Sequence, residues 1–308
     1  FNLAKSIKKN NLKFFFISNY LKTNFIKILK NENFNYIKIS NLNHTKSLIT
    51  KINLIGLDIL ITDYYKLKNI QKKTLKKYVN YLAVIDDFTD KIHSSDLFIN
   101  NNFLNLQSIK KIKKLNPKSR LLLGPKYSIL DKSFLKIRNK KSKINNKISI
   151  FCFFGTSDPS NETMKCLNAL SGYKNLNVNV LIGKLNKNYK KIKQKFKSSR
   201  NFKFFYNIPN KKVYSIINNS NISIGSGGIN MLERLFLGIP SIVICTAENQ
   251  KDSIENLVKK KFIIFLGNFK KVKESNIKDA VDNLINNEAK TRKIRKKLNL
   301  YFNKIKKV

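Results

Sequence analysis

The stretch Ile222–Gln250, ISIGSGGINMLERLFLGIPSIVICTAENQ, predicts a strand, a glycine-rich loop, a helix and a second strand in immediate succession. Its first apolar run is typical of a short buried strand, and the apolar residues after the double glycine recur at helical spacing. Gly238 and Pro240 end this helix, because neither residue is favoured inside one. The β-branched run Ser241–Cys245 then resumes a strand. This order predicts an α/β fold in which the strands form a parallel sheet.

The loop between the first strand and the helix has the composition of an anion-binding turn. Gly227 and Gly228 carry no side chains that would hold a phosphate away from the backbone N–H groups, and a helix N-terminus attracts negative charge. Glu233 follows one turn into the helix, where a ribose would lie if a nucleotide phosphate capped that helix. Glycine-rich turns also occur in α/β proteins that bind nothing there. The combined features favour a ligand site over a plain turn.

The residues after the second strand add polar groups to this edge. Glu248, Asn249 and Gln250 follow the strand directly, and the carboxyl ends of parallel strands share one edge of a sheet. A carboxylate and two amides suit sugar hydroxyls. We therefore predict a site for a nucleotide-linked sugar.

Several other segments carry a resemblance to a known family. With the stretch quoted above, they resemble the UDP-2,4-diacetamido-2,4,6-trideoxy-β-L-altropyranose hydrolases of pseudaminic acid biosynthesis, relatives of the lipid II-forming glycosyltransferase. The resemblance covers nearly the whole chain. The segments are Asp63–Tyr64, Tyr81–Asn102 (YLAVIDDFTDKIHSSDLFINNN), Leu122–Tyr127 (LLGPKY) and Phe154–Thr163 (FGTSDPSNET).

The chain departs from the family pattern in three places. Asn101 stands where the family has Gln, and Thr156 stands where it usually has Gly. Family members also begin with a strand and a Gly-x-Gly-His loop, whose histidine is the presumed base that activates water. Phe1 and the residues after it have the spacing of the helix that follows this loop. We therefore expect an N-terminally truncated product with its first strand missing and its catalytic histidine ahead of Phe1, and we assign no catalytic residue.

The resemblance implies roles for two sets of residues. The first set would bind UDP, with the loop after a neighbouring strand closing the phosphate side. The second set would bind the sugar, although the acids among Asp63–Asp87 are nearly as well explained as caps of helices or turns. The UDP set is Gly227, Gly228, Glu233, Gly155, Thr156 and Ser157. The sugar set is Asn249, Gln250, Glu248, Asp63, Tyr64, Asp86 and Asp87.

The two histidines offer little as catalysts. His44 lies in a polar stretch that is typical of a solvated loop, and the spacing of His93 after the paired acids favours a structural turn over a base. No spacing of His and Cys residues indicates a metal site, and the pair Asp86–Asp87 is weak grounds for magnesium. The sequence predicts neither a metal nor a cofactor.

The composition limits the partners. The 308 residues carry a formal net charge of +44, which ordinarily points to nucleic acid. Only six of the basic residues are arginines, and the lysines are scattered over every segment, so we expect no specific nucleic-acid binding and, at most, non-specific adhesion to anionic surfaces. Three cysteines without disulfide spacing suit a reducing cytoplasm. No apolar run is long enough to span a bilayer.

The expected strands fall into two sets, which predict two doubly wound Rossmann-like domains facing a cleft, the glycosyltransferase-B architecture. We place the domains at residues 1–135 and 147–287, with a charge-rich linker or hinge over 132–147 and a basic helix over 288–308 that crosses back. The first set of strands covers 14–18, 36–39, 59–62, 82–86 and 97–100. The second set covers 148–154, 177–182, 202–205, 222–224, 242–245 and 262–265.

The resemblance implies hydrolysis of a UDP-linked 2,4-diacetamido-2,4,6-trideoxy hexose to the free sugar and UDP, without a metal. Two other classes of function stay open. A nucleotide-sugar glycosyltransferase would share the UDP half-site, and it would need an apolar patch for a membrane-linked acceptor that periodicity does not indicate. A catalytically dead UDP-binding remnant would follow from the absence of the Gly-x-Gly-His loop.

Overall fold

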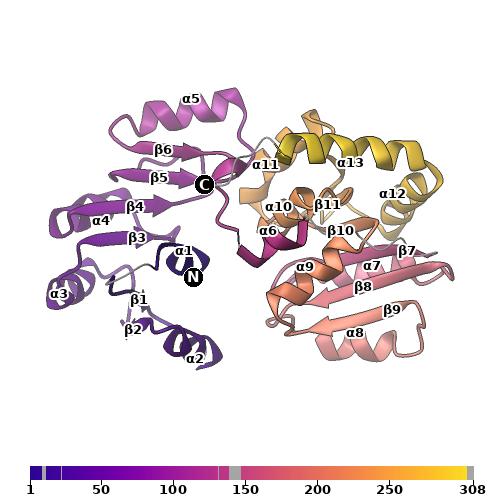
Figure 1. Cartoon of the computed structure of the whole chain (residues 1–308), viewed down its shortest axis with the longest axis horizontal. Helices are drawn as coiled ribbons and strands as arrows, with labels where there is room; N and C mark the ends of the chain where they lie inside the picture. Colours follow the sequence, from indigo (N-terminus) through magenta and orange to yellow (C-terminus); the bar gives the residue numbers. More distant parts are fainter. Residues whose placement is uncertain (9–11, 22, 131, 139–146, 304–308) are drawn as a thin grey trace. The chain divides into compact units, whose positions relative to one another are not determined.

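The computed structural model describes residues 1–8, 12–21, 23–130, 132–138 and 147–303. The chain divides into two compact units, Phe1–Ile129 and Leu130–Val308. Strands and helices alternate along each unit (Figure 1), as the sequence predicts for an α/β protein. The boundary between the units precedes the predicted charge-rich linker.

The first unit contains two parallel sheets. β1 pairs with β2, and β3, β4, β5 and β6 pair in that order. Both sheets pack on one apolar cluster, to which Ile17 of β1 and Leu60 of β3 contribute beside Leu48 and Ile52 of α3. The elements are α1 (Asn2–Ile7), β1 (Phe15–Ser18), α2 (Thr23–Asn31), β2 (Asn35–Lys38), α3 (Thr45–Ile55), β3 (Ile59–Thr62), α4 (Asn69–Leu75), β4 (Tyr81–Ile85), β5 (Leu97–Asn100), α5 (Leu106–Leu115) and β6 (Arg120–Leu123).

The second unit contains one six-stranded parallel sheet in the order β12-β11-β10-β7-β8-β9. The chain enters at β7 and builds outward on one side and then on the other, so the order reverses between β7 and β10 (Figure 1). Ligands of such sheets bind beyond the carboxyl ends of the strands at this reversal. The strands are β7 (Ile148–Phe153), β8 (Leu176–Ile182), β9 (Phe202–Tyr206), β10 (Ile222–Ser226), β11 (Ser241–Cys245) and β12 (Ile263–Asn268).

The first and the last helix of the second unit pack against other helices of the same unit. α13 holds its buried face, with Ile294, Leu298 and Phe302, on its own unit, and Phe302 stacks edge-on against Phe236 of α10. The helices are α6 (Lys132–Arg138), α7 (Glu162–Leu170), α8 (Tyr189–Lys195), α9 (Asn210–Asn218), α10 (Ile229–Phe236), α11 (Lys251–Lys259), α12 (Glu274–Asn286) and α13 (Glu288–Asn303).

The predicted strands are confirmed as β1–β5 and β7–β12, with ends that shift by at most a few residues. β6 is the strand that the sequence analysis did not predict. β10 continues through Gly225 and Ser226, which the sequence analysis placed in the loop.

The predicted linker starts differently from the expectation. Residues 132–138 form the helix α6, whose Phe134 is completely buried against Tyr214 and Phe236, at ring-centroid distances of 4.7 and 5.2 Å. Arg138 at the end of α6 donates to the carbonyl of Phe302 at 3.2 Å and lies over the Phe236 ring. Residues 139–146 of the predicted linker lie outside the described residues.

Phe134→Ala should destabilise the second unit by about 3–5 kcal/mol, because the truncation leaves a cavity among aromatic rings that cannot close it. Urea unfolding measures the change. Leu300→Ala, which alters a 54% exposed side chain on α13, is the control and should change the free energy of unfolding by no more than about 0.5 kcal/mol. Equal effects of the two variants would show that α6 is not anchored as described.

Candidate functional site

The loop between β10 and α10 depends on a close approach of the backbone. A Cβ atom on Gly225 would lie 2.1 Å from the carbonyl oxygen of Phe153 on β7, so only glycine fits there. A Cβ atom on Gly227 would lie 2.5 Å from Cδ1 of Ile254, and one on Gly228 would meet nothing nearer than 3.8 Å. The loop is therefore packed tightly at its start and open at Gly228, where α10 begins.

Gln250 holds this loop to the tip of β11. Its Oε1 accepts from the N–H of Gly227 at 3.2 Å and from the N–H of Thr246 at 3.0 Å. Its Nε2 lies 3.3 Å from the hydroxyl of Thr246. The side-chain oxygen of Gln250, a predicted sugar-binding residue, thus joins two loops at the same edge of the sheet.

The other residues predicted at this edge differ in their surroundings. Glu233 is half-buried on α10, and its Oε2 accepts from Asn230 Nδ2 at 2.6 Å. Glu248 is exposed and pairs with Lys251 at 2.7 Å. Asn249 is half-buried in the short turn that precedes α11. Glu233 thus lies on the helix that follows the glycine loop, and Glu248 and Asn249 lie in the turn after β11, which Gln250 joins to that loop.

The N-termini of α7 and α10 offer different electrostatic environments. The carboxylate of Asp158 accepts from the N–H groups of Glu162 and Thr163 at 2.9 and 3.0 Å, so α7 already has an anion at its first turn. α10 has Gly228 as its N-cap, and this residue has no side chain to accept from the first turn. In the part of the chain that the structure describes, no side chain caps the first turn of α10, whose Met231 N–H donates to the Gly228 carbonyl at 2.8 Å, so this helix end differs from that of α7 in having no carboxylate at its first turn.

The loop after β7 was predicted to close the phosphate side. Gly155 is half-buried with φ of +97°, and Thr156 and Ser157 are exposed. The carbonyl of Thr156 accepts from the N–H of Leu185 at 3.0 Å, which fixes this loop against the loop after β8. The two hydroxyl groups lie on the surface beside the point where the strand order reverses.

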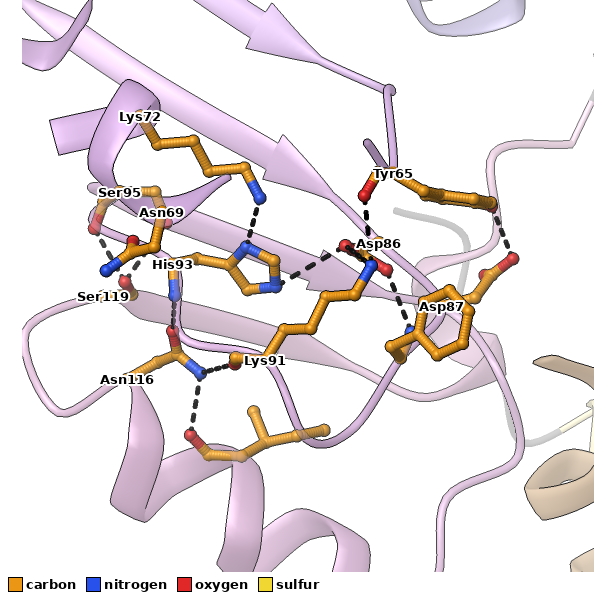
Figure 2. Close-up of polar contacts among 12 residues, drawn as sticks. Tyr65, Asn69, Lys72, Asp86, Asp87, Lys91, His93, Ser95, Asn116 and Ser119 are labelled. Carbon is orange, nitrogen blue, oxygen red and sulfur yellow. Dashed lines mark hydrogen bonds and ion pairs between the residues drawn. The ribbon is translucent and has the colours of Figure 1, made fainter. Parts of the chain in front are cut away.

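In the first unit, the polar residues after β3, β4 and β5 gather at one edge of the sheet. Asp87 accepts from the Tyr65 hydroxyl at 2.6 Å (Figure 2) and from Asn102 Nδ2 at 2.9 Å. Burial, together with the hydrogen bond to Asp87, raises the pKa of Tyr65. Loss of surrounding water, and then the negative charge of Asp87, raise the pKa of Asp63. Asp63 and Asp87 are therefore close enough to influence each other.

Asp86 and Tyr64, the sequence neighbours of Asp87 and Tyr65, lie toward the interior of the unit. Asp86 is 1% exposed, and Tyr64 packs against the apolar cluster around Leu48 and Leu75. The structure thus places Asp87 and Tyr65 at the edge, and it places Asp86 and Tyr64 within the unit. The sequence analysis did not single out Tyr65.

Asp86 belongs to a network with the buried residues Lys72 and His93 and the half-buried Lys91 (Figure 2). The Nζ of Lys72 lies 2.8 Å from His93 Nδ1, and the Nε2 of the same ring lies 3.8 Å from the Asp86 carboxylate. Lys91 Nζ lies 3.4 Å from the same carboxylate. The ring of His93 packs on Phe98 at a centroid distance of 4.5 Å. These contacts give His93 the structural role that the sequence predicted.

His44, by contrast, is exposed at the N-cap position of α3 and makes no side-chain cap. Among the residues that the structure describes, no group of three or more His, Cys, Asp or Glu side chains is arranged to hold a metal ion. Within the same residues, no helix is both long and apolar enough to cross a membrane.

Known structures share the fold of this chain. MurG of Acinetobacter baumannii superimposes with a TM-score of 0.66 over 100% of this chain and 94% of its own, at 10% identity. MnaA of S. aureus, solved with UDP, superimposes with a TM-score of 0.65 over 96% of this chain and 86% of its own, at 11% identity. The chain has the glycosyltransferase-B fold. At these identities the likeness concerns the fold alone.

The sequence comparisons do not assign the chain to a family. No family model matches the chain. The uncharacterized protein MJ1062 of Methanocaldococcus jannaschii is 27% identical over 267 residues, which are 84% of this chain and 54% of that protein. The chain therefore spans about half the length of the curated relative that it matches.

The stability of the first unit should depend on pH through His93. Burial, and then the charges of Lys72 and Lys91, lower the pKa of His93 to about 3, against about 6.5 in the unfolded chain. Between these values the unfolded chain binds more protons, so this contribution is fully present above about pH 6.5 and falls by up to about 1.4 kcal/mol per pH unit below it.

Urea unfolding of the wild type at pH 7 and pH 5 measures this dependence. His93→Asn should show a smaller loss of stability between the two pH values, because no buried imidazole remains. His44→Asn, which alters an exposed histidine, should keep the wild-type loss. An unchanged pH dependence in His93→Asn would contradict the assignment.

Proposed function

We propose that the second unit binds UDP through the N-terminus of α10. The observation that carries this proposal is the open first turn of α10 beside the tightly packed glycine loop, at the reversal of strand order where ligands of such sheets bind. MnaA, which has the same fold, was solved with UDP. Glu233 is proposed to accept from the ribose hydroxyls.

We further propose that the protein hydrolyses a UDP-linked 2,4-diacetamido-2,4,6-trideoxy hexose to the free sugar and UDP, as in pseudaminic acid biosynthesis. The family resemblance of the Tyr81–Asn102 and Phe154–Thr163 segments supports this reaction. Water would form a bond to the anomeric carbon, and the bond from that carbon to the phosphate oxygen would break with its electron pair staying on UDP. The positive end of α10 would stabilise the charge that grows on the departing diphosphate.

We propose that Asn249 of the second unit contacts the sugar. Within the first unit, considered by itself, Asp63 and Asp87 are the predicted sugar-binding residues that share one edge of the sheet. The carboxyl group of Asp63 and the carboxylate of Asp87 lie at the edge of their sheet, and both can hydrogen-bond hydroxyl or amide groups. Neither His93 nor His44 is proposed as the base, because His93 is buried with its pKa lowered and His44 is exposed in the loop before α3.

A nucleotide-sugar glycosyltransferase is the second candidate, because the chain has the glycosyltransferase-B fold. It would use the same UDP site and pass the sugar to an acceptor in place of water. The two reactions differ in what they require, since a transferase releases little UDP in the absence of its acceptor.

Glu233→Ala should weaken UDP binding about tenfold, because the loss of a charged acceptor for the ribose hydroxyls costs about 1.5 kcal/mol. Isothermal titration of UDP measures the affinity. Glu255→Ala removes an exposed carboxylate from α11 and should leave the affinity unchanged. An unaltered affinity in Glu233→Ala would refute the ribose assignment.

The reaction can be tested with UDP-2,4-diacetamido-2,4,6-trideoxy-β-L-altropyranose in ¹⁸O-labelled water. Hydrolysis at the anomeric carbon should release UDP that carries no ¹⁸O, because the water oxygen joins the sugar. Label in the UDP would indicate attack at phosphorus. Tight UDP binding without release would favour the UDP-binding remnant or the transferase, and addition of a lipid-linked acceptor would separate these two.

A further inference from the structure

Arg234 lies completely buried on the inner face of α10, beneath the glycine loop. It is 0% exposed although it is charged, and it shares the buried face of this amphipathic helix with Met231 and Leu235. Its Nη2 donates to the carbonyl of Ser226 at 2.6 Å, and its Nε donates to the carbonyl of Asn230 at 3.4 Å. Its Nη1 is buried without a hydrogen-bond partner among the described residues. That nitrogen lies 2.9 Å from the position of a Cβ on Gly225.

This arrangement is costly for a residue with only a packing role. A buried guanidinium loses its hydration, and an unpartnered donor adds to the cost, whereas methionine or leucine would fill the same space without it. Burial lowers the pKa of Arg234 to about 10, so the side chain keeps its positive charge at neutral pH. The nearest acid on its own helix is Glu233, which is half-buried and bonded to Asn230.

The position of the guanidinium determines the direction of the loop peptides. By accepting from Arg234, the Ser226 carbonyl points toward the helix, and the N–H of the same peptide, on Gly227, points outward to Gln250. The next N–H groups belong to the open first turn of α10, which begins at its N-cap Gly228. The buried charge therefore lies at the peptide that leads into the first turn of α10.

We infer that Arg234 is a positioning residue that fixes the glycine loop and supplies a permanent positive charge beneath it, so that the site selects a nucleoside diphosphate over the nucleoside. This inference rests on the proposed UDP site. Arg234 does not touch the ligand, because the loop peptides lie between them. Its charge adds to the positive end of the helix, and the low polarity of its surroundings strengthens the effect.

The test compares affinities for UDP and uridine, by calorimetry for UDP and by NMR titration for uridine. The ratio of the two dissociation constants reports the contribution of the phosphates alone. Arg234→Met keeps the volume of the side chain and removes its charge, and we expect the ratio to fall about tenfold or more while uridine affinity changes less than about twofold. Arg234→Lys keeps the charge and loses the planar fork, and we expect its ratio to fall less than about threefold.

The outcomes separate the two proposals. A wild-type protein that binds UDP no better than uridine would refute the UDP site itself. A wild type that prefers UDP, with the same ratio in Arg234→Met, would overturn the role of Arg234 and leave the site intact. If Arg234→Met fails to fold by circular dichroism, Arg234→Lys decides alone, and a tenfold fall of its ratio would contradict the role of the charge.

Discussion

The approach of β10 to β7 at Gly225 is the constraint on which the candidate site depends. Any side chain at this position would collide with the Phe153 carbonyl and with the Arg234 guanidinium. Because the strand ends without a Cβ there, Arg234 can reach beneath the loop and hold the Ser226 carbonyl. Gln250 holds the other side of the same loop through the N–H of Gly227. Two side-chain contacts thus fix the peptides that precede the open turn of α10.

The N-termini of α7 and α10 differ in whether an acidic side chain accepts from the first turn. Both helices follow the central strands of the sheet, and both present a positive end to the place where ligands of this fold bind. Asp158 occupies the first turn of α7, whereas a glycine caps α10. The sheet therefore offers one open helix end at the reversal of strand order, and the proposed position of the diphosphate follows from this asymmetry.

Most strands could be predicted because buried parallel strands contain short apolar runs, although residues 36–39 and 202–205 each include a lysine and residues 177–182 include two asparagines. β6 was missed because its three leucines follow a polar turn and run into Gly124–Pro125. The helix α6 was missed because it begins the lysine-rich stretch 132–147, while its anchor is the spacing of two buried residues, Phe134 and Ile137. Local composition could not reveal an anchor that depends on rings from α9 and α10.

The sequence located the edges of the site better than the orientation of its side chains. Successive residues of an extended segment point to opposite sides, so of Asp86 and Asp87, or of Tyr64 and Tyr65, one faces inward, and tertiary packing decides which. Arg234 was missed for a related reason. A charged residue on a helix is ordinarily solvated, and only its position three residues after Met231 on the apolar face could have indicated burial.

A crystal structure of the protein in complex with UDP would test the central claim most directly. The account predicts that the β-phosphate accepts hydrogen bonds from backbone N–H groups in the first turn of α10, that Ser226 stays bound to Arg234, and that the ribose lies against Glu233. A diphosphate bound elsewhere, or at α7 with Asp158 displaced, would contradict it.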